Sequence, residues 1–143
     1  MLVRDVVDRT AADVVMVAPD DTIADAVDLL KEHAIGAVVV SADGQLISGI
    51  ISERDIVRHL AAEQEGTLRL KVEELMTENV STCTADDDAW ETMATMTAGR
   101  FRHMPVVTAT GGLTGIVSLG DLVKARLAEL ETLNTELRES SSD

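Results

Sequence analysis

The sequence predicts an α+β fold of two tandem β-α-β-β-α repeats that share a core about a pseudo-twofold axis, followed by a C-terminal amphipathic helix. The first observation is a motif, GIISERD (49–55), which returns as GIVSLGD (115–121). The second is that helical and strand-like patterns surround both copies in the same order. A repeat of about 60 residues buries too little surface to be stable alone, so the two repeats are expected to pack together.

The two repeats align without a gap when residues 14–58 are placed over residues 80–124. Nine of these 45 pairs are identical, and five of the nine fall within residues 49–57, so the similarity is concentrated at the motif. Upstream, VRDVV resembles VEELM at a slightly larger offset, which predicts a few extra residues in the first repeat near Thr10–Asp13. We expect the first repeat at 1–66, the second at 67–126 and a helical extension with a disordered tail at 127–143.

Each repeat is expected to begin with a short strand and a helix. The first strands contain Met16 and Thr82. In PDDTIADAVDLLKEH (19–33), apolar residues at helical spacing follow Asp and Thr residues that can cap a helix. The equivalent residues 85–99 keep most of the same apolar face, so both segments are predicted to be helices.

A hairpin and a second helix complete each repeat. AVVVS (37–41) and LISGII (46–51) flank Asp43-Gly44, which is a strong hairpin signal. MPVVT (104–108) and LTGIV (113–117) flank Gly111-Gly112 in the same way. A helix is predicted to begin directly after each motif.

The long final helix carries an apolar stripe. We expect this stripe to be buried, either on its own domain or, as we favour, against a second subunit. Its residues are Val123, Leu127, Leu130, Leu133 and Leu137.

Composition excludes several classes of function. The net charge of −14 repels phosphate backbones, which argues against nucleic acid as a partner. No apolar run is long enough for a membrane helix and the N-terminus lacks a signal-peptide core, so we expect a cytoplasmic protein without a membrane partner. The single cysteine, Cys83, fits a reducing compartment and is expected to be buried. Trp90 and Phe101 are the only aromatic residues, so a bound base must lie between aliphatic side chains.

The repeated motif has two interpretations. Ser52 and Ser118 stand where a strand turns into a helix, and serine there caps the helix while Asp three positions later suits its first turn. The same geometry presents free N–H groups that favour a phosphate, and an Asp nearby accepts hydroxyl groups of a ribose. Capping and binding therefore both explain Asp55 and Asp121.

The chain resembles the family of CBS-domain pairs, also called Bateman modules. The segments that carry the resemblance are VAPDDTIADAVDLL, GAVVVSADGQLISGIISERDIV, FRHMPVV and LTGIVSLGDLV, and it covers roughly residues 1–126. The resemblance implies that Asp55 and Asp121 bind ribose, with Ser52 and Ser118 beside them. It also implies that Met16 and Thr82 on the first strands make backbone contacts to the base. The base pocket would lie beside the second strands and be lined by Ile35, Gly36, Ala37, Arg102, His103, Met104 and Pro105.

The two repeats differ at the positions expected to meet phosphate. Arg102 and His103 match basic positions that meet phosphate in this family, whereas the first repeat has Gly36 and Ala37 there. Arg54 at a helix start is poorly placed for the helix dipole, so it suits a bound anion or, alternatively, a surface ion pair. The differences predict two unequal clefts.

The leading hypothesis is a sensor for an adenine nucleotide of the AMP, ADP, ATP or NAD class, without a catalytic cofactor, which regulates an unidentified protein partner in trans as a homodimer. The alternative is a structural or protein-interaction module whose clefts stay empty. An enzyme is not expected, because the sequence shows no nucleophile–base pair and no Walker-type loop. Its three histidines lack metal-ligand spacing, so no metal site is expected.

Overall fold

A computed structural model describes residues 1–7, 13–63 and 65–141 of the chain and has the predicted α+β architecture. In the first repeat the elements are β1 (Met16–Val17), α2 (Ile23–His33), β2 (Ala37–Val40), β3 (Gly49–Ser52) and α3 (Glu53–Ala62). In the second they are α5 (Ala89–Gly99), β4 (His103–Val107), β5 (Leu113–Ser118) and α6 (Leu119–Ser141). Three short helices lie outside this pattern: α1 (Val3–Val6), the 3-10 helix η2 (Thr67–Arg69) and α4 (Val72–Leu75).

Both repeats pair their strands in the same register. In the first sheet, β2 runs parallel to β1 and antiparallel to β3, and Ala37 faces Ser52. In the second sheet, β4 and β5 are antiparallel and His103 faces Ser118. The expected first strand of the second repeat is reduced to a single parallel bridge between Cys83 and Val106. The predicted repeat therefore holds, with one strand shortened.

The helix boundaries also repeat, because the same capping devices act at both. Thr22 caps α2 by accepting from the Asp25 N–H, and Asp88 caps α5 by accepting from the N–H groups of its first turn. Both helices end at a left-handed residue, Ala34 with φ 51° and Arg100 with φ 59°. Neither residue is glycine, so each helix end carries a small backbone strain.

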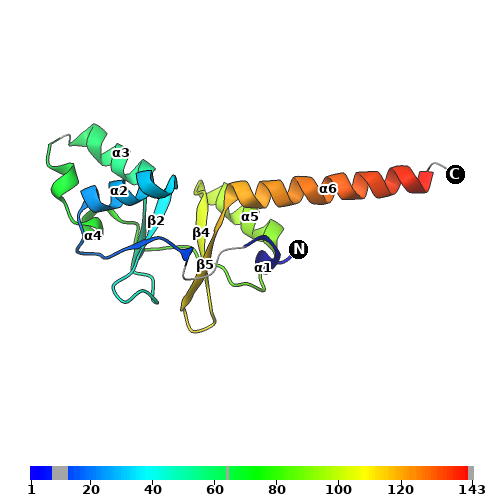
Figure 1. Cartoon of the computed structure of the whole chain (residues 1–143), viewed down its shortest axis with the longest axis horizontal. Coiled ribbons are helices and arrows are strands. Elements are labelled where there is room, and N and C mark those ends of the chain that lie inside the picture. The colour runs from blue at the N-terminus through cyan, green and yellow to red at the C-terminus, as the bar shows by residue number, and fades with distance from the viewer. Residues whose placement is uncertain (8–12, 64, 142–143) are drawn as a thin grey trace.

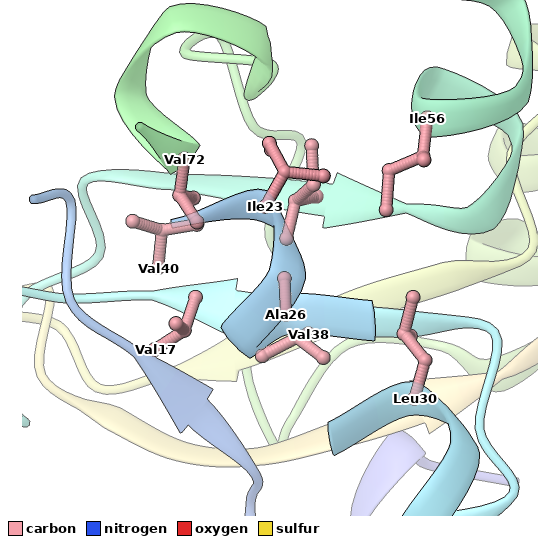
Figure 2. Close-up of a cluster of buried hydrophobic side chains, with 9 residues drawn as sticks. Val17, Ile23, Ala26, Leu30, Val38, Val40, Ile56 and Val72 are labelled. Carbon is pink, nitrogen blue, oxygen red and sulfur yellow. The ribbon is translucent and has the colours of Figure 1, made fainter. Parts of the chain in front are cut away.

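Each repeat has its own apolar core. Figure 2 shows the first, in which Ile23, Ala26 and Leu30 of α2 pack over Val38 and Val40 of the central strand. The second is built in the same way between α5, β4, β5 and the start of α6, and it includes the buried Cys83, as predicted. A third, smaller cluster of Val14, Val39 and Leu113, with partly buried Met16, Ile47 and Ile116 around it, joins the two repeats into one core.

The short helix that leads each repeat packs on the other repeat. In Figure 1, α1 lies beside α5, and α4 lies beside α2 and α3. Val3 N–H donates to the Asp87 carbonyl (2.9 Å), and Val72 N–H donates to the Asp21 carbonyl (2.8 Å), so the two leading segments use equivalent acceptors. Arg4 of α1 also forms an ion pair with Asp86. Each repeat is thus completed by a segment from outside it.

Helix α6 leaves the body of the molecule. It begins in the second core with Leu122, which is fully buried, and then extends past α5 as a single rod (Figure 1). The apolar stripe stays exposed along this rod, from Val123 at 42% to Leu137 at 67%. The alternative that the stripe packs on its own domain is therefore not what the fold shows. Among the described residues, no helix is apolar enough over a sufficient length to cross a membrane.

We predict that Val3→Ala destabilises the second repeat although Val3 stands at the start of the first. Val3 is fully buried in the second core, so losing its two methyl groups should lower the free energy of unfolding by about 2 kcal/mol. Denaturant unfolding measures the loss, and amide exchange locates it.

The matched control is Val57→Ala, because Val57 is 61% exposed and should change stability by no more than about 0.5 kcal/mol. Faster exchange in β2 and β3 with unchanged exchange in β4 and β5 would contradict the packing of α1 described above.

Candidate ligand-binding site

A cavity of about 230 Å³ lies between the two repeats. The first repeat contributes the end of α2 and the start of β2, and the second contributes the start of β4, the end of β5 and the first turn of α6. The lining residues are Val7, Asp13, Val14, Val15, Ala34, Ile35, Gly36, Ala37, His103, Ile116, Ser118 and Asp121.

The structure brings together six of the predicted site residues in this cavity, namely Ile35, Gly36, Ala37, His103, Ser118 and Asp121. Eight others do not line it: Met16, Ser52, Arg54, Asp55, Thr82, Arg102, Met104 and Pro105.

Sequence reasoning did not select the remaining six lining residues. Ile116 lies two positions before Ser118 on the same strand, so strand alternation places it on the same face, and this signal was available. Val14 and Val15 precede the first strand, and Ala34 ends α2 in the left-handed conformation. No local pattern marks those three as cavity walls.

The motif of the second repeat places a carboxylate at the cavity edge. Ser118 ends β5, and its Oγ accepts from the Asp121 N–H at 3.1 Å, which caps the first turn of α6. The Asp121 side chain is exposed, and among the described residues its carboxylate accepts no hydrogen bond. Both carboxylate oxygens of Asp121 are therefore available to hydroxyl groups of a bound molecule.

The motif of the first repeat uses its carboxylate differently. Asp55 Oδ2 accepts from Ser52 N–H at 3.0 Å and from Ser52 Oγ at 2.9 Å, and Ser52 Oγ lies 3.2 Å from the Asp55 nitrogen. These contacts form a reciprocal capping box at the start of α3. In the first repeat the Asp55 carboxylate therefore takes part in capping. In the second repeat only the backbone N–H of Asp121 does.

His103 reaches across from the second repeat to the backbone of Gly36. A Cβ atom on Gly36 would lie 3.2 Å from His103 Cε1 and 3.4 Å from Glu53 Oε1, so any side chain at this position would crowd the imidazole. Burial lowers the pKa of His103 and the Arg102 charge lowers it further, while Asp121 and Glu53 raise it. The imidazole therefore favours its neutral form.

The predicted phosphate contacts are separated by the fold. Arg54 Nη1 donates to the carbonyl of Arg100 at 3.1 Å, so its guanidinium ties α3 to the second repeat. Arg102 is exposed, yet its charge is close enough to affect His103. Of these three residues only His103 lines the cavity, while Arg102 acts on it from outside the lining and Arg54 does not belong to it.

A larger cavity of about 460 Å³ lies on the outer face of the first repeat, between α2, α3 and η2. Its walls are mainly aliphatic side chains, including Val57, Leu60 and Leu68. It offers few polar groups to orient a small polar ligand, so we assign the candidate site to the smaller cavity between the repeats.

The tandem fold and the inter-repeat cavity define a regulatory type of ligand-binding module. The chain belongs to the CBS-domain family, because the family model for the CBS domain matches residues 3–62 and 72–128. An uncharacterised 17.7 kDa protein of Acidianus ambivalens is 39% identical over 80% of this chain and 68% of its own length. The mitochondrial CBS domain-containing protein CBSX3 of Arabidopsis thaliana is 37% identical over 83% of this chain and 61% of its own length.

Solved structures share the fold. The CBS-domain containing protein ATU1752 from Agrobacterium tumefaciens has a TM-score of 0.81 and 43% identity, covering 88% of this chain and 99% of that one. CBSX2 in complex with AMP has a TM-score of 0.74 and 25% identity, covering 89% and 96%. The CBS domain pair of MJ0100, in complex with 5-methylthioadenosine and S-adenosyl-L-methionine, has a TM-score of 0.76 and 26% identity, covering 87% and 98%. Adenosine compounds therefore bind to related CBS pairs.

We predict opposite effects of two substitutions on the pKa of His103. Arg102→Gln should raise it, because a repelling positive charge is removed, and Asp121→Asn should lower it, because an attracting negative charge is removed. Nuclear magnetic resonance titration of the imidazole C–H signals measures both shifts.

Arg58→Gln is the control, since Arg58 is exposed on α3, and it should leave the titration unchanged. Shifts of the same sign in the two variants would contradict the arrangement. Because the folded pKa lies below the ordinary value, the unfolded chain binds more protons, so His103 should reduce stability as the pH falls through about 6.5.

Proposed function

We propose that the chain is a regulatory module that binds an adenine nucleotide, of the AMP, ADP, ATP or NAD class, in the cavity between its repeats. The observation that carries the proposal is the Asp121 carboxylate at the edge of that cavity, which accepts no hydrogen bond among residues 1–7, 13–63 and 65–141. A carboxylate that accepts no hydrogen bond from the described residues is suited to the two hydroxyl groups of a ribose. Ser118 beside it supplies a further polar atom.

The remaining walls suit the other two parts of a nucleotide. Ile35, Ala37 and Ile116 offer aliphatic surfaces to a base, as expected for a chain with almost no aromatic residues. His103 lines the cavity, and the Arg102 charge acts on it from outside the lining, so a phosphate at this end would be attracted.

The ligands of related structures support the adenosine part of this proposal. AMP in CBSX2 and the two adenosine compounds in MJ0100 share a ribose and an adenine but differ in the charge of the remaining group. The shared part corresponds to Asp121 and the aliphatic walls here. We infer that the phosphate is selected by His103 and Arg102.

Regulation is proposed to act in trans on a protein partner, from a cytoplasmic homodimer, without catalysis or a catalytic cofactor. α6 starts within the cavity wall, so occupation at Asp121 acts directly on the element that leaves the body of the molecule. A ligand shifts such an equilibrium only through its different affinity for the two arrangements of the repeats.

A second candidate is a module that binds no small molecule at all. Asp55 is engaged in a capping box and Arg54 is bound to a backbone carbonyl, so the first motif is explained without a ligand. If the second motif acts in the same way, the protein is a structural or protein-interaction module. Only binding measurements separate the two functions.

We predict that Asp121→Ala weakens binding of the preferred nucleotide at least about tenfold, while Asp55→Ala mainly destabilises the fold. Isothermal calorimetry with AMP, ATP, NAD and S-adenosylmethionine on the wild type should show binding of at least one compound at sub-millimolar concentration. Arg102→Ala should weaken the binding of AMP but leave the affinity for 5-methylthioadenosine unchanged, because 5-methylthioadenosine has no phosphate.

Asp28→Ala is the matched control, since it removes an exposed carboxylate from α2 far from the motif. A ligand at a hundred times its Kd should stabilise the protein by about 2.7 kcal/mol, which a melting experiment detects. Absence of both heat and thermal stabilisation with all four compounds would favour the ligand-free module.

A further inference from the structure

We propose that the projecting part of α6 pairs with α6 of a second copy as a parallel, in-register two-stranded coiled coil. The relevant surface is the α6 stripe, which we define as Val123, Leu127, Leu130, Asn134 and Leu137. This inference does not depend on the proposed ligand.

The α6 stripe has the spacing of a coiled-coil seam. Its members are separated by four, three, four and three residues, which is the heptad alternation of a and d positions. Leu133 lies beside the seam and widens its apolar surface. The spacing is that of a two-stranded pair rather than of a broad face packed on a globular core.

The α6 stripe points away from the protein's own core. Leu119 and Leu122 pack in the second core, and Arg126 lies over the Trp90 ring at 5.0 Å, so these residues define the inner face of α6. Val123 follows Leu122 by one residue and therefore lies about 100° around the helix. The seam begins beside the body and continues along the exposed rod.

Nothing within the described chain covers the outer part of this seam. Every residue from Leu130 to Ser140 is exposed, and the rod extends past α5 and α1 (Figure 1). A helical end of this length is only marginally stable in water, and aligned exposed leucines favour association. The buried first turns fix the helix in place, which lowers the entropic cost of pairing.

Asn134 selects the parallel, in-register arrangement. A single asparagine at an a position specifies register and a two-stranded state, because the two amides can hydrogen-bond to each other across the seam. In an antiparallel pair that places Leu127 opposite Leu130, Asn134 would lie level with Val123 and lose hydrogen bonds to water without replacement. An unpaired amide is costly, so the second copy is expected to run parallel.

Charge next to the seam agrees with this arrangement. Arg126 occupies a g position and Glu131 an e position, and in a parallel pair each g residue faces the e residue of the following heptad. Arg126 binds Glu129 of its own helix at 2.8 Å. In the parallel pair, Arg126 also lies opposite the negative charge of Glu131 on the second copy. The pairing produces no contact between like charges at these positions.

The test is disulfide trapping in the full chain. Asn134→Cys should form a covalent dimer on mild oxidation, at least about tenfold faster than Thr132→Cys, because Thr132 lies on the opposite face of α6. Cys83 is a weak background, since it is buried and burial raises its thiol pKa to about 11. Equal trapping of the two variants would overturn the proposal.

A second pair of variants tests whether the α6 stripe packs against a different surface of the second copy. Leu130→Asp should raise the dimer dissociation constant about a hundredfold by light scattering, and Leu68→Asp should leave it unchanged. Leu68 lines the aliphatic cavity between α2 and α3, which is a second apolar surface. If Leu68→Asp dissociates the dimer and Asn134→Cys fails to trap one, the α6 stripe of one copy would instead pack in this cavity of the other copy. That result would overturn the coiled coil.

Discussion

The fold depends on the exchange of leading segments between the repeats. Val3 completes the second core and Val72 completes the first, each through an equivalent backbone hydrogen bond and full burial. A repeat of about 60 residues buries little apolar surface, so losing such a residue removes a large share of its stability. The exchange holds the repeats face to face, and the cavity exists only because both faces stay in place.

Two copies of one motif serve different purposes because neighbouring residues differ. In the first copy the Ser52 hydroxyl and the Asp55 carboxylate satisfy each other, and the guanidinium between them in sequence ties the helix to the opposite repeat. In the second copy, Gly120 replaces that arginine, and the carboxylate of Asp121 accepts no hydrogen bond in the part of the chain that the structure describes. The same motif thus forms a closed capping box in the first repeat, whereas in the second repeat its carboxylate lies at the edge of the cavity.

Much of this structure could be predicted because it is set locally. Caps, hairpin turns and alternating strands are read within a few residues, so the register of His103 against Ser118 follows from the register of Ala37 against Ser52. The crossing of α1 and α4 was not predictable, since it depends on backbone groups far apart in the chain. For the same reason, the sequence did not indicate that Val14 and Val15 line the cavity. A pattern of residue types also does not reveal which of the two Asp carboxylates is hydrogen-bonded within the protein.

Helix α6 begins at Leu119, two residues before Asp121, and runs for 23 residues, about 34 Å, as one continuous rod. Its base is a wall of the cavity and its far end projects beyond the body of the chain (Figure 1). Such a rod is a lever: a tilt of about 5° at the base displaces the tip by about 3 Å. Small rearrangements around a single carboxylate are therefore magnified into movements as large as a side chain.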